Sequence, residues 1–314
     1  MTTPRVPARA LPFAMVIAML VVPVASCGGN DEATGEANLL AEEAVARTNR
    51  GSSQGRIPQF LVECPFSHFA PDDPIVWPGA PGRSHNHTFI GNNSADAFST
   101  VESLSEGDTN CQLKQDKASY WAPTLFDHGE PVAPYKADAY YRPGLLVDPT
   151  TIEPYPLGLK MIAGDHTQPE QPLDVARWSC GTGSPRQTTA PECEGKVTLR
   201  LEVIFPDCWN GKDLDSDDHQ SHMATSSGGE CPESHPVPVP QLMLALSYPI
   251  RGPGHDLKLA SGDTGTAHAD FFNAWEPEAL EREISSCLHR QVVCGVASNR
   301  PPADGLIPDD GEER

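Results

Sequence analysis

The sequence predicts a mainly β protein: a β-sandwich or jelly-roll-like single domain with long disulfide-pinned loops and one C-terminal helix. Three observations predict it. Proline and glycine are abundant, with 32 and 26 residues among 314, as in loop-rich β folds. Several segments alternate apolar and polar residues with the period of two of a half-buried strand. Nine cysteines, one of them near the N-terminus, leave eight along the core for up to four disulfides.

The clearest strand pattern lies at residues 196–205. One face would be apolar and buried, while Thr198, Arg200 and Glu202 would face water. The apolar face consists of Val197, Leu199, Leu201, Val203 and Phe205. Residues 241–248 repeat the pattern with Leu242, Leu244, Leu246 and Tyr248. Shorter strands are expected at 85–90, 120–126, 134–141 and 157–162.

One strong helix is predicted, at residues 277–289. Its apolar positions fall at helical spacing: Leu280, Ile284, Cys287 and Leu288. Pro277 suits the first helical turn, and Glu278 there is favourable to the helix dipole.

The N-terminus has the layout of a lipoprotein signal peptide, expected at residues 1–26. Arg5 and Arg9 precede an apolar run at 11–24, and the quartet Val-Ala-Ser-Cys at 24–27 matches a bacterial lipobox. Cys27 would become the acylated first residue, held at the membrane by its lipid. The alternative is an ordinary signal peptide cut nearby, which would leave Cys27 as a free thiol. Acylation of Cys27 predicts an exported protein at the outer face of the cytoplasmic membrane or in the cell envelope.

The remaining chain divides by composition into three parts. Residues 27–57 form a polar segment expected to be a flexible tether, and residues 299–314 an acidic tail expected to be disordered. Residues 58–298 carry the remaining cysteines and all five tryptophans, with no gap that resembles a linker. A single globular domain is therefore expected there.

The cysteines of the domain are expected to form four disulfides in an oxidising compartment. Their order favours neighbouring pairs: Cys64 with Cys111, Cys180 with Cys193, Cys208 with Cys231, and Cys287 with Cys294. Eight cysteines allow many other pairings. A thiolate zinc site is the competing explanation, but the sequence contains no CxxC pair.

The formal charge of −21 limits the partners of the chain. Loss of Arg5 and Arg9 with the leader makes it two units more negative. Nucleic acid is excluded as an expected partner, because its binding depends on lysine and arginine at the phosphates. A polyanionic substrate would be repelled unless a local basic patch or a bound cation offset the field. The membrane, through the lipid, and a neutral glycan are the expected partners.

The sharpest candidate site is formed by His85 and His87. On a strand they would project from one face about 6.6 Å apart, near enough to bind one metal ion or one substrate. Histidines two apart also occur by chance, so this pair alone does not establish a metal site or a substrate site.

A second candidate combines His219 and His222 with an acidic stretch at residues 213–218. The two imidazoles would share one face of a helical turn, and a divalent or transition metal ion is the expected cofactor of a set comprising His85, His87, His219 and His222. An EF-hand is excluded because Asp218 and Ala224 stand where glycine and glutamate are required. The alternative is a solvated acidic loop pinned by a Cys208–Cys231 bridge.

Other histidines are weaker candidates, because each stands only beside a serine, beside an aspartate or two residues from one: His128, His166, His235 and His268. The histidines are numerous and stand among tryptophans and tyrosines. Such a mixture suits a site in which aromatic rings stack on a sugar and imidazoles supply acid–base or metal chemistry. HExxH, GxSxG and Walker A motifs do not occur, nor does GxGxxG before a helix, so the common zinc-protease, α/β-hydrolase, P-loop and Rossmann sites lack support.

Long polar motifs of the chain resemble a known family. They are FSHF (66–69), DDPIV (72–76), SHNH (84–87), YWAP (120–123), KMIAGD (160–165), FPDCWNGK (205–212), DHQSHM (218–223), SHP (234–236) and AHADFFNAW (267–275). They resemble a family of secreted proteins of bacteria and filamentous fungi described as a domain of unknown function, over about residues 58–295. Some fungal members are fused to WSC modules, which are associated with cell-wall glycans. The resemblance implies an extracellular, polysaccharide-related role and brings no catalytic residues with it.

Two functions are expected in parallel. One is a glycan-acting enzyme, a hydrolase or lyase, with His85, His87, His222 and His268 in its site and Asp207 or Asp270 assisting them. The other is a non-catalytic lipoprotein that binds a glycan or a transition metal through the same histidines. A third hypothesis is a purely structural component of the cell envelope. The enzyme hypothesis and the binding-protein hypothesis both require the imidazoles to lie close together in the folded protein.

Overall fold

The computed structural model describes residues 57–181 and 183–294. The predicted leader, the predicted acylation site Cys27, the predicted tether up to residue 56 and the predicted tail at 299–314 lie outside these residues. All described residues belong to one of the two units into which the chain divides, the unit 43–314. The predicted domain limits at 58 and 298 stay predictions.

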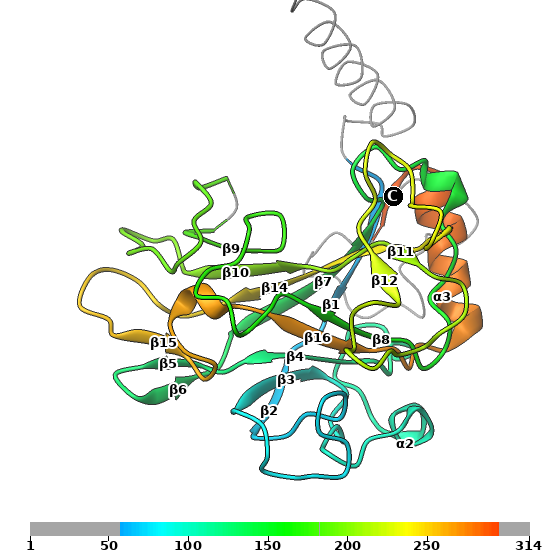
Figure 1. Cartoon of the computed structure of the whole chain (residues 1–314). Helices are drawn as coiled ribbons and strands as arrows, with labels where there is room; N and C mark the ends of the chain where they lie inside the picture. Colours follow the sequence, from blue (N-terminus) through cyan, green and yellow to red (C-terminus); the bar gives the residue numbers. More distant parts are fainter. Residues whose placement is uncertain (1–56, 182, 295–314) are drawn as a thin grey trace, which may run out of the picture. The chain divides into compact units, whose positions relative to one another are not determined.

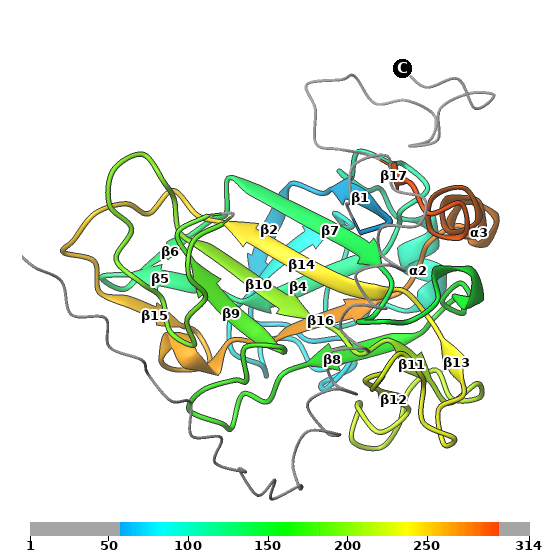
Figure 2. The same cartoon turned by 90° about the horizontal axis from the view of Figure 1, so that it is seen from above.

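Six strands form the largest sheet, in the order β17–β1–β7–β14–β10–β9. Figure 2 shows the last five of them side by side. Neighbouring strands are antiparallel except β1 and β17. Their bounds are β17 Val293–Cys294, β1 Gln59–Glu63, β7 Lys136–Arg142, β14 Gln241–Ser247, β10 Arg200–Ile204 and β9 Ala176–Ser179.

Five antiparallel strands form the second sheet, in the order β2–β3–β4–β16–β8. Their bounds are β2 Phe66–Ala70, β3 His87–Gly91, β4 Ser119–Pro123, β16 Ala269–Phe272 and β8 Lys160–Ala163.

Two small sheets of three strands each lie at opposite ends of the main sheets (Figures 1 and 2). One contains β15 (Leu257–Leu259), β5 (Leu125–Asp127) and β6 (Glu130–Val132). The other contains β12 (Met223–Ala224), β11 (Cys208–Trp209) and β13 (Val237–Pro238).

The two main sheets pack around one shared apolar core. Leu242, Leu244 and Leu246 of β14 and Tyr120 and Ala122 of β4 are buried in the same cluster. These residues alternate along their strands, so each strand turns every second side chain inward. The prediction of a mainly β fold is confirmed, and the two main sheets form a sandwich.

A buried polar contact also joins the two sheets. The hydroxyl groups of Tyr120 on β4 and Tyr141 on β7 lie 2.5 Å apart. Tyr120 donates to Asp116 Oδ2 (2.6 Å), and Tyr141 accepts from Trp275 Nε1 (3.0 Å). Buried hydroxyls with partners stabilise a core, whereas hydroxyls without them destabilise it.

The predicted helix is present. α3 (Pro277–Glu283) continues into a π-helical turn, η3 (Ile284–His289). Leu280, Ile284, Cys287 and Leu288 are buried, as their spacing predicts. The other helical elements are short: α2 (Val101–Glu106) and the 3₁₀ turns η1 (Pro149–Thr151) and η2 (Thr264–Thr266).

The predicted strands are found with shifted ends. The segment 241–248 corresponds to β14, with all four predicted residues in the core. The segments 134–141, 85–90 and 157–162 correspond to β7, β3 and β8, and 120–126 is divided into β4 and β5.

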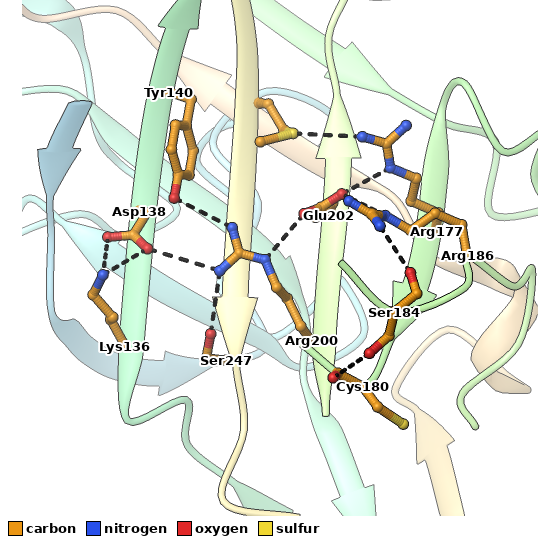
Figure 3. A network of polar contacts seen from close by, with 11 residues as sticks. Lys136, Asp138, Tyr140, Arg177, Cys180, Ser184, Arg186, Arg200, Glu202 and Ser247 are labelled. Atoms are coloured by element: carbon orange, nitrogen blue, oxygen red, sulfur yellow. Dashed lines mark hydrogen bonds and ion pairs between the residues drawn. The ribbon is translucent and has the colours of Figure 1, made fainter. Parts of the chain in front are cut away.

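One expectation for the strand at 196–205 is wrong. Val197 is 45% exposed, and Arg200 and Glu202, predicted to face water, are 8% and 3% exposed. Glu202 accepts from Arg177 Nε (2.8 Å), Arg186 Nε (3.3 Å) and Arg200 Nε (3.0 Å), as Figure 3 shows. The arginine stems lie along the sheet and cover it, so the outer face of β10 is filled by an ion-pair network instead of water.

Four disulfides join the cysteines in their order along the chain: Cys64–Cys111, Cys180–Cys193, Cys208–Cys231 and Cys287–Cys294. This is the neighbouring pairing expected from the sequence. Four disulfides are typical of an oxidising environment outside the cytoplasm.

Within the described part of the chain, no helix has the length and apolar character needed to cross a bilayer.

Candidate metal centre

The outer face of the five-stranded sheet, turned away from the shared core, carries the candidate site. Trp121 of β4 pairs with Phe89 of β3 on one side and with Asp270 of β16 on the other. Two residues further along, His87 pairs with Pro123, and His268 continues the same register just before β16. Because residues two apart share a face of a strand, His87 and His268 emerge on this outer face, on either side of Pro123.

Three imidazoles meet there. The ring centroids of His85 and His87 lie 4.3 Å apart, those of His85 and His268 5.2 Å, and those of His87 and His268 6.3 Å. One ring nitrogen of each lies within 4.8 Å of the others. His87 and His268 are buried, while His85 is only partly covered.

Backbone carbonyls orient two of the rings. His87 Nδ1 lies 2.8 Å from the carbonyl oxygen of Asp72, and His268 Nδ1 lies 2.9 Å from that of Thr266. A carbonyl oxygen can only accept, so each Nδ1 donates its proton and each neutral ring keeps a lone pair on Nε2.

Two of the inward nitrogens have nothing to bind among the described residues. Nε2 of His85 and Nε2 of His87 are buried and without a hydrogen-bond partner there. A buried polar atom without a partner is unfavourable, and these two nitrogens could accept a bond from a ligand.

The surroundings keep these rings neutral. Burial, with a smaller contribution from His166, lowers the pKa of His85 to about 4. Burial and the neighbouring histidines hold the pKa of His87 well below its usual range. Burial lowers the pKa of His268 to about 3, against the opposing effect of its bond to Thr266. Metal ions bind the neutral imidazole, so all three rings are in the binding form at neutral pH.

The donor set fits a transition metal. Imidazole suits zinc, copper, iron and nickel, and ligating histidines usually donate their other ring N–H to a carbonyl or carboxylate. An ion about 2.0–2.1 Å from each nitrogen would hold neighbouring nitrogens roughly 3.4 Å apart.

Asp270, expected to assist the histidines, lies on the same face two residues after His268. It is 2% exposed, and its Oδ2 has no hydrogen-bond partner among the described residues. Burial and the nearby Asp73 hold the pKa of Asp270 well above its usual range. A neutral carboxyl donates a proton instead of accepting one, so Asp270 is suited to act as an acid and not as a base.

His219 and His222, expected as ligands with His85 and His87, have other partners. His222 Nε2 donates to the carbonyl oxygen of Lys160 (2.7 Å), and its Nδ1 is bonded to the hydroxyl of Ser216 (2.9 Å). His219 Nδ1 lies 2.8 Å from Asp215 Oδ1. The three-histidine group therefore contains His268 in place of these two.

Asp207 is engaged in holding a loop. Its carboxylate accepts from the backbone N (2.8 Å) and the hydroxyl (2.6 Å) of Ser226, just before β11. Burial raises its pKa despite these bonds. Asp207 therefore stabilises the loop that the Cys208–Cys231 disulfide closes.

His166, which the sequence offered only as a weak candidate, lies beside the three histidines. Its ring centroid is 6.2 Å from that of His85 and 5.8 Å from that of His268. In the sequence, Gly164 stands two residues before His166. Its role is to let the turn approach His268, and this approach is seen only in the structure.

Comparison with known proteins gives a family without an assigned activity. The profile of the family described as Domain of unknown function (DUF1996) matches residues 73–275. The matched segment includes all four clustered histidines, His85, His87, His166 and His268. No curated protein and no solved structure matches the chain.

Proposed function

We propose, from the premise that the chain belongs to the DUF1996 family, that the protein binds a transition metal ion through His85, His87 and His268 outside the cytoplasm. The observation that carries the proposal is the convergence of three ring nitrogens within 4.8 Å, two of them buried without a partner among the described residues. Core histidines that serve only packing usually have a hydrogen-bond partner at each buried nitrogen.

Zinc and copper are the proposed ions. The group contains no carboxylate or thiolate, and a purely imidazole shell is suited to these metals and poorly suited to calcium or magnesium, which prefer oxygen ligands. A neutral ligand set leaves the full charge of the ion in place, and the excess of acidic residues in the chain favours cation approach.

The proposed location is the cell envelope, with Cys27 as the lipid anchor. The four disulfides support an oxidising compartment, and the Val-Ala-Ser-Cys quartet at 24–27 supports acylation. Replacement of Cys27 by serine should move the protein from the membrane fraction to the soluble fraction. Retention of that variant in the membrane fraction would contradict lipid anchoring.

A second candidate function is that of a glycan-acting enzyme. A hydrolase would need a metal-bound water in a fourth coordination position, and the partly covered His85 leaves one side of the group near solvent. The reading has less support, because His222 and Asp207, expected in its site, bind other residues. Product analysis on a panel of neutral polysaccharides, with metal-loaded and chelator-treated protein, tests it.

Metal titration of the chelator-treated protein tests the proposed function. At a free ion concentration one hundred times Kd, binding stabilises a fold by about 2.7 kcal/mol, which for a domain of this size raises Tm by roughly 5–10 °C. Zinc or copper should produce this shift with one ion bound per chain, and calcium should not.

Two variants make this test specific. His85→Ala should keep the fold, because His85 is only partly covered, and should lose the metal-induced shift. His128→Asn is the matched control: His128 lies in the exposed turn between β5 and β6 at φ 49°, where asparagine is tolerated. The proposal is wrong if wild-type protein takes up neither metal, or if His85→Ala responds as the control does.

A further inference from the structure

The turn after β8 places a fourth imidazole at the metal centre. His166 is exposed, and its ring centroid lies 6.2 Å from that of His85 and 5.8 Å from that of His268. These separations match the 6.3 Å between His87 and His268, which already belong to the group. Two imidazoles on one tetrahedral ion have ring centres about 5 Å apart. His166 is not among the three histidines whose ring nitrogens lie within 4.8 Å of one another, so its ring would have to turn toward His85 and His268 to share an ion with them.

The turn is fixed by Asp165. Its Oδ1 accepts from the backbone N (2.9 Å) and the hydroxyl (2.6 Å) of Thr167, and its Oδ2 accepts from Gln168 Nε2 (3.2 Å). The side-chain amide of Gln171 is bonded to both the backbone N (3.0 Å) and the carbonyl oxygen (2.7 Å) of Asp165. The backbone next to His166 is therefore held in one conformation, which reduces the entropy lost when its ring binds.

Gly164 brings this turn close to the centre. It has φ +93°, and a Cβ there would lie 2.9 Å from His268 Cβ and 3.0 Å from the carbonyl oxygen of Ala267. Only glycine fits both the backbone conformation and the close approach. Gln220 Nε2 donates to the carbonyl oxygen of Gly164 (3.1 Å) and holds the turn from its other side.

We propose that His166 is the fourth ligand of the ion held by His85, His87 and His268, and that it closes the coordination shell from the solvent side. The inference rests on the proposed metal-binding function and specifies it. The rings of His87 and His268 are held by backbone carbonyls, whereas the exposed His166 lies on a turn whose backbone is fixed by Asp165. The ion then has four imidazole ligands and no bound water.

A closed shell has a chemical consequence. Structural zinc sites use four protein ligands, whereas hydrolytic sites use three and keep a water. Four imidazoles therefore favour a protein that holds or hands over an ion, with the exposed His166 as the ligand that the ion meets first.

Cobalt(II) with azide as a probe tests the inference. Azide enters an open coordination position and changes the visible spectrum of bound cobalt. The full-length protein, loaded with cobalt, should show no azide-induced change, and His166→Ala should show one. Exogenous imidazole should restore the azide-resistant spectrum in the variant. Loss of one ligand of four should also weaken cobalt binding at least tenfold, while the surface control His128→Asn should behave as wild type.

The outcomes separate the two proposals. If wild-type protein binds cobalt or zinc but responds to azide as strongly as His166→Ala, the fourth-ligand inference is overturned and metal binding by three histidines stands. If wild-type protein binds none of cobalt, zinc or copper, both proposals fall. An equal cobalt affinity in wild type and His166→Ala would also contradict the fourth ligand.

Discussion

Gly164 packs so closely against His268 that a Cβ atom added to the glycine would lie 2.9 Å from Cβ of His268. The contact joins the turn that carries His166 to the strand that positions His268. A side chain at position 164 would therefore act on both histidines at once.

Replacement of Gly164 by alanine should destabilise the fold and disturb the metal centre together. Gly129→Ala is the matched control, because Gly129 has a similar φ of +85° but no atom within 4 Å of the added Cβ. Gly129→Ala should lower the free energy of unfolding by about 1–2 kcal/mol through backbone strain alone. Gly164→Ala should lower it by roughly 1–3 kcal/mol more through overpacking, and should reduce the metal-induced rise in Tm. Equal losses in urea unfolding would contradict the contact.

Removal of the Tyr141 hydroxyl should weaken the join between the two sheets. Tyr141→Phe leaves the buried Nε1 of Trp275 and the hydroxyl of Tyr120 without their bonds to this oxygen. The free energy of unfolding should fall by about 1–3 kcal/mol. Tyr248→Phe is the control, since the Tyr248 hydroxyl is buried with no hydrogen-bond partner among the described residues. Its removal should be neutral or stabilising, and a similar loss in both variants would contradict the network.

Stability should fall with rising pH through Asp116. Burial raises the pKa of Asp116 to about 7, against the bonds it accepts from Tyr120 and Ala118. An ordinary aspartate has a pKa of about 3.9. Between these values the folded protein keeps a proton that the unfolded chain has lost, so the contribution of this group to stability is complete below about pH 4 and is lost as pH approaches 7.

The difference between wild type and Asp116→Asn isolates this group from other titrating residues. The stability of wild type relative to the variant should decline from pH 4 to pH 7 by on the order of 4 kcal/mol. Urea unfolding at several pH values measures it. A constant difference across this range would show that Asp116 has an ordinary pKa.

Loss of the Glu202 charge should destabilise the outer face of the six-stranded sheet. Arg177, Arg186 and Arg200 all donate to this carboxylate. Glu202→Gln should lower the free energy of unfolding by roughly 3 kcal/mol, because nearly buried charges lose their partner, with less contributed by the partly exposed Arg186. Glu130→Gln, at an exposed position of β6, should change it by less than about 0.5 kcal/mol. Similar values for the two variants would show that the network is not stabilising.

Local patterns in the sequence were sufficient for the elements of the fold. The alternation at 241–248 placed Leu242, Leu244 and Leu246 in the core, and the spacing of Leu280, Ile284 and Leu288 placed the helix. The order of the cysteines favoured the four pairs that the structure contains. Alternation did not predict the environment of Arg200 and Glu202, because it identifies the outer face of a strand but not whether arginines from β9 and a neighbouring loop cover that face.

The candidate site depended on contacts that local patterns do not contain. His85 and His87 are close in sequence, and strand geometry predicted that they share a face, although β3 begins only at His87. His222 stands in an equally suggestive motif, yet its Nε2 is bound by the carbonyl oxygen of Lys160, 62 residues away.

By itself the sequence determined a mainly β chain, its likeness to a family of unknown function, an even set of eight core cysteines and the histidines from which a site could be built. Only the tertiary structure decided that His268 and His166, and not His219 and His222, stand beside His85 and His87. The physical reason is that β3 and β16 are brought together by pairing with β4, a long-range register that sets which imidazoles share a face and which are bonded elsewhere.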